Sequence, residues 1–280
     1  MPDNAVPRIP CTVVIPARNE AAALPEVLSR LSRFAEVVVL DSQSEDATAE
    51  VAEAHGARVL QFAWDGRYPK KRNWFLLTHP PATPWVLFLD ADEFVDAAFV
   101  EALARAIRRD DVVGYWLTYS NSFLGRPLRH GVPQRKLALF RVGAGLYERI
   151  EEEAWSGLDM EIHEHPILEG RTAEITVPIE HRDDRGLAQF LRKHIDYAAW
   201  EAKRTAALAG DPLAWEALTG RQRFKYRHIG AGWYAMFYFV YTYVVKLGVL
   251  DGRAGYHYAT YKAWYFRTIR LLLREQSRTK

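Results

Sequence analysis

The sequence predicts an α/β fold with a mostly parallel sheet flanked by helices, followed by a helical, aromatic and basic C-terminal extension. In the first 110 residues, short apolar runs rich in β-formers alternate with amphipathic stretches of helical period. Polar turns follow three of these apolar runs, as at the carboxyl edge of a parallel sheet. The last sixty residues have a different composition, which predicts a separate element.

Composition is that of a globular protein, with 280 residues that are 49% hydrophobic and 26% charged. The single cysteine, Cys11, excludes an internal disulfide and a cysteine-based zinc cluster. Asp3 and three prolines fall within the first ten residues, which contain no apolar run like that of a signal peptide. We therefore expect a cytoplasmic protein.

Charge is distributed unevenly along the chain, although the net charge is only +2. Residues 221–280 contain twelve Lys and Arg against two acids, and 15 of the 36 aromatic residues. Residues 1–220 then carry 25 Lys and Arg against 33 Asp and Glu, a net charge of −8. We expect a main domain over 1–220 and an extension over 221–280.

The first two predicted strands each end in a polar turn that opens a helix. Residues 12–16 form a buried strand, the turn 17–20 follows, and leucines and a valine lie on one helical face to residue 31. Residues 37–40 form the next strand, which leads through Asp41 into a helix ending near Gly56. A third strand covers 58–62. Parallel pairing would bring Asp41 and Asp90 to the same edge.

The apolar run 85–89 ends in Asp90, Ala91, Asp92 and Glu93. Carboxylates spaced one residue apart at a strand end suit Mg²⁺ or Mn²⁺, and such a metal would hold a diphosphate. The alternative is a solvated turn that caps the following helix, which is the commoner fate of an isolated D-x-D.

A basic turn precedes this run, with four cations between residues 67 and 72 at the start of a short helix. Helix starts favour acids, so cations there are poorly placed unless they face an anion such as a diphosphate. A solvated basic face is the alternative.

The middle of the chain contains strands at 114–119 and 137–141, separated by a turn-rich loop at 121–136. Two histidines and two acids fall within 161–165, where they could bind a metal, transfer protons or simply lie in an exposed loop. His181 alone is a weaker candidate. A long helix follows from 187 to about 209.

The extension has a 17-residue run without charge at 229–245, flanked by cations. That run is short for a membrane span, whereas aromatics mixed with cations suit the headgroup level of an anionic membrane. A buried helical pair or a homo-oligomer interface is the alternative. Nucleic-acid binding would leave the acidic first 220 residues unexplained and lacks an RNA-binding motif, so no nucleic-acid partner is expected.

Three motifs together resemble family 2 glycosyltransferases with the GT-A fold: residues 14–20, 39–48 and 89–93, in that family's order and spacing. Further segments resemble the subgroup that adds sugars to the lipopolysaccharide core, namely 121–126, 130–131, 139–141, 162–164 and 246–255. Gln134, Arg135 and Lys136 depart from the pattern of that subgroup.

The resemblance implies a nucleotide-diphosphate sugar donor, a divalent metal (Mg²⁺ or Mn²⁺), and a glycan or lipid-linked acceptor at the inner face of the cell membrane. The residues implied in donor binding are Pro16, Ala17, Glu20 and Asp41 for the nucleoside, Lys70, Arg72 and Asn73 for the diphosphate, and Asp90 for ribose or sugar. Asp92 would bind the metal, with His163 as a further metal or phosphate contact.

The resemblance also implies inversion at the anomeric carbon, which needs one carboxylate as base for the acceptor hydroxyl. Glu164 is the first candidate and Glu93 the second. Two other functions compete with transfer. A catalytically silent nucleotide-sugar-binding membrane scaffold would keep the donor site alone. A sugar nucleotidyltransferase normally has a Gly-rich phosphate loop after its first strand, whereas residues 17–20 contain no glycine.

Overall fold

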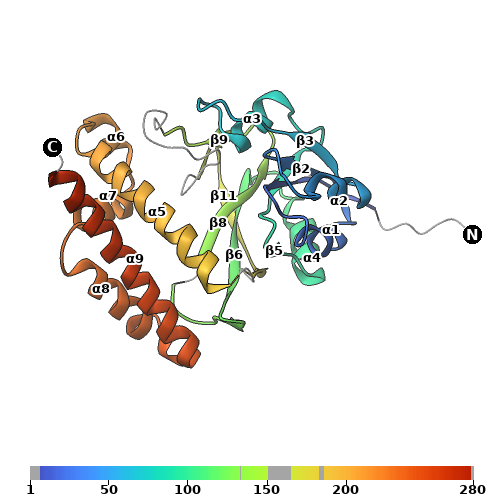
Figure 1. The fold of residues 1–280 in the computed structure, drawn as a ribbon. Helices are drawn as coiled ribbons and strands as arrows, with labels where there is room; N and C mark the ends of the chain where they lie inside the picture. Colours follow the sequence, from blue (N-terminus) through green and yellow to red (C-terminus); the bar gives the residue numbers. More distant parts are fainter. Residues whose placement is uncertain (1–6, 133, 151–164, 183–185, 279–280) are drawn as a thin grey trace, which may run out of the picture. The chain divides into compact units, whose positions relative to one another are not determined.

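The computed structural model describes residues 7–132, 134–150, 165–182 and 186–278, which form two compact units (Figure 1). The first unit covers residues 1–120 and 134–182, and the second covers 121–133 and 183–280. The second unit therefore starts before the compositional change at residue 220 and includes a short segment from the middle of the chain.

Parallel strands form one half of the sheet in the first unit, in the order β3-β2-β1-β4. They are β1 (Ile9–Ala17), β2 (Phe34–Asp41), β3 (Arg58–Gln61) and β4 (Trp85–Phe88). Helices α1 (Leu24–Ser29), α2 (Thr48–Ala54) and α3 (Lys71–Thr78) lie between them in the sequence. Ala17 pairs with Asp41, and the N–H of Leu89 donates to the carbonyl of Val14. The turns after β1, β2 and β4 therefore meet at one edge, as the sequence predicts.

The other half of the sheet is mainly antiparallel and continues the order from β4 through β8, β6 and β11 to β5. These strands are β8 (Gln134–Arg141), β6 (Gly114–Phe123), β11 (Thr172–His181) and β5 (Glu93–Phe94). A separate pair joins β9 (Gly145–Tyr147) to β10 (Pro166–Leu168), and α4 (Ala97–Ala106) follows β5. This arrangement places Lys136 on the strand next to β4 and places His181 opposite Glu93.

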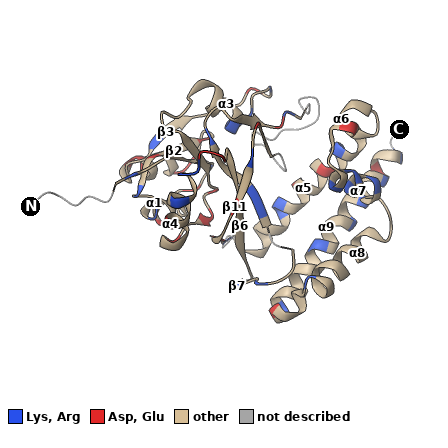
Figure 2. Ribbon diagram, turned by 180° about the vertical axis from the view of Figure 1, so that it is seen from behind, with Lys and Arg blue, Asp and Glu red and all other residues tan. Residues whose placement is uncertain are grey.

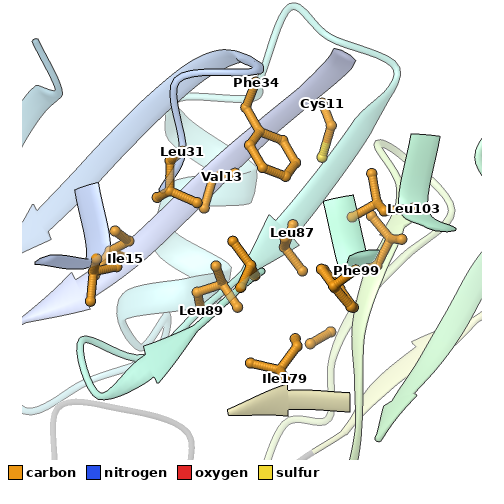
Figure 3. Close-up of a cluster of buried hydrophobic side chains, with 14 of the residues drawn as sticks. Cys11, Val13, Ile15, Leu31, Phe34, Leu87, Leu89, Phe99, Leu103 and Ile179 are labelled. Atoms are coloured by element: carbon orange, nitrogen blue, oxygen red, sulfur yellow. The ribbon is translucent and has the colours of Figure 1, made fainter. Parts of the chain in front are cut away.

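The core of the first unit lies on both faces of the sheet. From Cys11 to Ala17 every residue of β1 is buried, as expected for a strand covered on both sides. One cluster joins β1 and β4 to α4 and β11, and Figure 3 shows Val13, Leu87, Phe99 and Ile179 among its members. The opposite face buries a smaller aromatic cluster around Phe75, Phe88 and Phe140.

The second unit is mainly helical, apart from the short β-segment in 121–132, and has its own core. Its elements are α5 (Leu187–Leu208), α6 (Pro212–Ala217), α7 (Gly220–His228), α8 (Tyr234–Val240), the π-helix η1 (Tyr241–Val245), the 3₁₀-helix η2 (Gly248–Asp251) and α9 (Gly252–Arg278). Ala198 and Ala202 of α5 pack with Ile229, Tyr234, Phe266 and Ile269. Within the described residues, none of the helices has both the length and the hydropathy needed to cross a bilayer.

The prediction of an irregular loop over 121–136 is wrong at both ends. Strand β6 continues to Phe123, a short β7 (Arg126–Pro127) folds back on it, and β8 already begins at Gln134. Cross-strand pairing of Thr118 with Arg135 and of Tyr119 with Gln134 outweighs the local turn signals. The irregular segment is therefore shorter than the glycines and prolines suggest.

Candidate active site

Side chains tie the turn after β1 to the turn after β2. The backbone N–H of Asn19 donates to Ser44 Oγ over 2.8 Å, and Asn19 Oδ1 accepts from the N–H of Glu45 over 2.8 Å. The N–H of Glu20 donates to Thr48 Oγ1 over 2.8 Å. Asn19 has a φ of 56°, in the left-handed region that asparagine tolerates better than most residues. These hydrogen bonds hold the turn after β1 and the turn after β2 together.

Asp41 is buried at the end of β2 and held by several donors. It accepts hydrogen bonds from the backbone N–H and the hydroxyl of Ser44 and, over 2.8 Å, from Gln61 Nε2. Pro16 and Ala17 lie beside it as the partners of Leu40 and Asp41 in β2. These donors fix the Asp41 carboxylate at the edge, where its remaining lone pairs can accept from a ligand.

Asp90 lies between two cations. Arg72 Nη2 is 3.0 Å from Asp90 Oδ1, and Lys136 Nζ is 2.6 Å from Asp90 Oδ2. The Arg72 guanidinium also lies over the ring of Tyr147, 5.4 Å from its centroid. The structure therefore brings Asp90 and Arg72 together, as expected for one site, and adds Lys136 to it.

Glu93 is buried beneath the same turn, with 1% of its side chain exposed. One of its oxygens forms a short ion pair with Lys136, and the other accepts from the N–H of Asp90 over 3.1 Å. Burial raises the pKa of Glu93, while the charge of Lys136 opposes that rise. The pKa of Lys136 is itself well above its ordinary value, because its two carboxylate neighbours outweigh its burial. These contacts favour a structural role for Glu93, and its role as a reserve base stays a prediction.

Asp92 faces His181, with Oδ1 3.5 Å from Nε2. The end of β11 is held against the turn by the N–H of Arg182, which donates to the carbonyl of Asp92 over 3.0 Å. Burial lowers the pKa of His181, but the hydrogen bond and the charge of Asp92 raise it by a larger amount, so the net shift is upward. Both side chains are largely but not fully buried, with 22% of His181 and 14% of Asp92 exposed.

Arg67 of the basic turn is exposed, but the other three cations are more buried than they would be on a solvated face. Lys70 and Lys71 are 7% and 2% exposed, respectively. Asn73 bonds through both ends of its amide to the backbone of Tyr147, with both distances 2.9 Å. Asn73 thus anchors β9, and its predicted contact with a diphosphate stays a prediction.

Two predicted site residues, His163 and Glu164, lie outside the described residues. Their neighbour His165 is described, packs on Trp116 with ring centroids 5.7 Å apart, and has its pKa lowered by burial. The structure therefore leaves the roles predicted for His163 and Glu164 untested.

Sequence reasoning missed Lys136 as a site residue and gave little weight to His181. The sequence marks Lys136 in one way only, since it lies in the stretch that departs from the pattern of the lipopolysaccharide core subgroup. His181 lies 89 residues after Asp92, and no local spacing links the two. Both reach the edge through antiparallel strands, β8 and β11, whose neighbours the sequence does not specify.

Comparison with protein families identifies the family to which this chain belongs. The sequence profile of Glycosyl transferase family 2 matches residues 12–154, just over half of the chain. The chain belongs to glycosyltransferase family 2. The matched range includes the turns after β1, β2 and β4, which the structure gathers at one edge.

This family 2 chain is 29% identical over 173 residues to the lipopolysaccharide core biosynthesis glycosyltransferase LpsC of Rhizobium meliloti. That match covers 59% of the chain and 60% of LpsC. The chain is also 30% identical over 127 residues to 4,4'-diaponeurosporenoate glycosyltransferase of Staphylococcus haemolyticus. This second match covers 42% of the chain and 34% of that protein. The chain thus spans three fifths or less of each of these relatives.

Among solved structures, the mannosyltransferase PcManGT of Pyrobaculum calidifontis, in complex with GDP-Man and Mn²⁺, resembles the chain with a TM-score of 0.52. The identity is 15%, and the match covers 96% of this chain and 88% of PcManGT. This likeness concerns the fold, and it agrees with the predicted GT-A class.

The donor atoms at the edge fit a divalent metal, although no group of three or more His, Cys, Asp and Glu side chains gathers around one point among the described residues. Asp92 and His181 supply one carboxylate and one imidazole. Mg²⁺ and similar ions in nucleotide sites often take only one or two protein ligands and complete their shell with substrate phosphates and water. Asp90 is less suited, because Arg72 and Lys136 already balance its charge.

Proposed function

We propose that this family 2 chain transfers a sugar from a nucleotide-diphosphate sugar to a glycan or lipid-linked acceptor, with inversion at the anomeric carbon. One observation carries the proposal. Asp41, Asp90 and Asp92 end up at a single edge of the parallel strands, together with Arg72 and Lys136. Carboxylates for a nucleoside and cations for a diphosphate are the groups that such a donor needs.

On the donor side, the Asp41 carboxylate would accept from base or ribose donors, next to the backbone of Pro16 and Ala17. The Arg72 guanidinium would face the diphosphate, where fixed positive charge stabilises the leaving group as the bond between the anomeric carbon and the diphosphate breaks. Lys70 would add to that positive charge. The Asp90 carboxylate would accept a hydrogen bond from a hydroxyl of the ribose or sugar.

Asp92 and His181 would hold a Mg²⁺ or Mn²⁺ ion. Such an ion, when bound, neutralises charge that develops on the departing diphosphate. Asp92 is the ligand that the D-x-D motif predicts, whereas His181 is proposed from its 3.5 Å approach to Asp92.

On the acceptor side, Glu164 would take the proton of the acceptor hydroxyl while that oxygen attacks the anomeric carbon. The new C–O bond forms as the bond to the diphosphate breaks, and the nucleoside diphosphate leaves with the electron pair. One base suffices because the displacement is a single step, and general-base assistance contributes about 10² to 10⁴ in rate.

The likeness to LpsC supports an acceptor of the lipopolysaccharide or lipid-linked class. We place the protein in the cytoplasm, peripherally at the inner face of the cell membrane, because twelve cations and 15 aromatics gather in the last sixty residues.

The decisive experiment is a thermal-shift panel of UDP-, GDP-, ADP- and dTDP-sugars with Mn²⁺ or Mg²⁺. A donor at 100 times its Kd should stabilise the fold by about 2.7 kcal/mol. Chelation of the metal with EDTA should remove most of that shift. Slow metal-dependent hydrolysis of the same sugar, followed as free nucleotide, would distinguish a transferase from a silent scaffold. A panel without any shift would contradict the proposal.

The matched variants are Asp92→Ala and Asp110→Asn, the latter a fully exposed carboxylate on another turn. Asp92→Ala should abolish metal-dependent binding of the nucleotide chosen by the panel, measured by calorimetry, and Asp110→Asn should leave it intact. Unchanged affinity in Asp92→Ala would remove Asp92 from the metal site.

A further inference from the structure

The helix formed by α8 and η1 has a fully apolar outer face. Five of its side chains fall on positions i, i+3, i+4, i+7 and i+11 and are between 43% and 66% exposed. They are Trp233, Met236, Phe237, Val240 and Val244. On the opposite face, Tyr234 and Tyr238 pack on Phe266 of α9. The helix is apolar all round, yet only one side of it is covered within the second unit.

The same surface continues from the last residue of η1 into the turn and the 3₁₀-helix η2 that lead to α9. Val245, Leu247, Val249 and Leu250 are 46% to 63% exposed. We call these four residues and the five of the helix face the apolar ridge.

The tip of the apolar ridge is held in a defined conformation. Leu247 has a φ of 58°, and a Cβ at Gly255 would overlap the carbonyl oxygen of Gly248, so the chain crosses itself closely there. Asp251 accepts from the backbone N–H groups of Arg129 and His130 at 3.1 and 2.9 Å. The side chains of the tip are therefore presented outward by a fixed backbone.

Helix α7 adds an aromatic and basic flank to the apolar ridge. The ring of Phe224 lies 6.4 Å from that of Phe237, and His228 lies 5.3 Å from Trp233. The cations Arg221, Arg223 and Arg227 on α7 are exposed, and Figure 2 shows the basic colour of this helix. Lys225 instead turns inward, with its Nζ 2.6 Å from the buried Glu201.

Charge distinguishes between two candidate partners of the apolar ridge, which are a second copy of the chain and an anionic bilayer. Residues 220–250 contain no Asp or Glu, and Asp251 is already engaged by His130 and the backbone. In a two-fold dimer the same patch meets itself, so two sets of arginines would face each other without carboxylates on this stretch to balance them. An anionic bilayer supplies the missing negative charge, and tryptophan, tyrosine and arginine all suit its interface.

We propose that the apolar ridge is the surface that enters an anionic lipid bilayer, with α8 and η1 lying in the plane of the interface and the arginines of α7 at the headgroups. This inference deepens the peripheral membrane contact proposed above and rests on it. It does not depend on sugar transfer, so donor binding and membrane binding are separately measurable.

The test is sedimentation of the full chain with vesicles of phosphatidylcholine and phosphatidylglycerol, compared with vesicles of phosphatidylcholine alone. Met236→Gln with Val240→Gln should weaken binding by at least about tenfold, because two apolar side chains no longer enter the bilayer. The control is Leu77→Gln in α3, which replaces a leucine that is 50% exposed in the first unit. This control should bind vesicles as the unaltered chain does.

A second variant tests the charge. Replacing Arg221, Arg223 and Arg227 together with Gln should remove the preference for phosphatidylglycerol, with about fivefold weaker binding for each arginine lost. Melting curves and nucleotide binding with Mn²⁺, measured on the same samples, show that the fold and the donor site are intact.

Equal vesicle binding by both variants and the unaltered chain would overturn the proposal. It would also be overturned if the chain ignored vesicles and sedimented as a dimer that Met236→Gln with Val240→Gln dissociates. If no nucleotide of the panel binds while the ridge variants still lose vesicle binding, the donor proposal fails and this one stands.

Discussion

Lys136 shows how one residue can hold a site together. Its ammonium group contacts both Asp90 and Glu93, and Glu93 is almost wholly buried. Three carboxylates within four residues would repel one another without a nearby cation. Lys136 therefore stabilises the turn that aims Asp92 at His181.

Replacing Lys136 with Met should destabilise the fold, because it leaves Glu93 buried without this partner. Loss of one member of a buried pair costs about 3–5 kcal/mol, and the partial exposure of Lys136 places the expected loss at the lower end. Urea unfolding measures the loss. Lys136→Met combined with Glu93→Met should recover much of it, whereas a single variant within about 0.5 kcal/mol of the unaltered chain would show that the pair is dispensable.

Glu164 is the residue on which the proposed chemistry depends most. Glu164→Gln should keep donor binding, because the amide removes only the proton acceptor, and should reduce transfer by about 10² to 10⁴. Measured turnover close to that of the unaltered chain, with the donor found by the panel, would exclude Glu164 as the base.

At the scale of elements, two distant segments of the sequence form a single corner. The segment 121–132 lies against the turn between η1 and η2, where the N–H of Gly131 donates to the carbonyl of Lys246 over 2.8 Å. His130 Nδ1 lies 3.0 Å from Asp251 Oδ1. The residues of these two segments, which the sequence shows only as separate motifs, are thus parts of one hydrogen-bonded turn.

The stability of this corner should depend on pH through Asp251. Burial raises the pKa of Asp251, but hydrogen bonds from the His130 side chain and from the backbone of His130 and Arg129 lower it by more. A carboxyl whose folded pKa is lowered stabilises the fold above its unfolded pKa of about 3.9 and loses that contribution as the pH falls. Asp251→Asn should therefore be less stable than the unaltered chain near neutral pH.

Urea midpoints at about pH 7 and pH 3.5 measure this dependence, since the difference between the two proteins should shrink toward the unfolded pKa of about 3.9 and below it. Thr260→Ala, on an exposed part of α9, is the control that should show no such change with pH. A difference that is constant with pH would mean that Asp251 acts through packing alone.

At the scale of the whole molecule, composition and contacts divide the chain at different places. The change in charge and aromatic content falls near residue 220, but α5 packs on α9 and Glu201 of α5 pairs with Lys225 of α7. The extension proposed at 221–280 therefore completes a core that begins at α5.

A chain that ends at Gly220 should lose the cooperative folding of the helical unit. It would lack Ile229, Tyr234, Tyr265, Phe266 and Ile269, each a buried side chain whose removal from the core costs about 1.5–3 kcal/mol. Hydrogen exchange should then show unprotected amides in α5. Full protection of α5 in the shortened chain would show that residues 221–280 are an independent extension.

The sequence alone determined the elements of local origin. The alternation of β-branched runs and helical periods specifies β1, β2 and β4, and parallel pairing brings the turns with Asp41 and Asp90 to one edge. Tertiary structure decided what depends on distant pairing. Lys136 and His181 arrive on antiparallel strands whose neighbours no periodicity specifies, and hydrophobicity alone cannot tell which face of the all-apolar helix α8 is covered. Packing on α9 buries one face of the helix and leaves the apolar ridge exposed on the other, a distribution that no periodicity in an all-apolar run can specify.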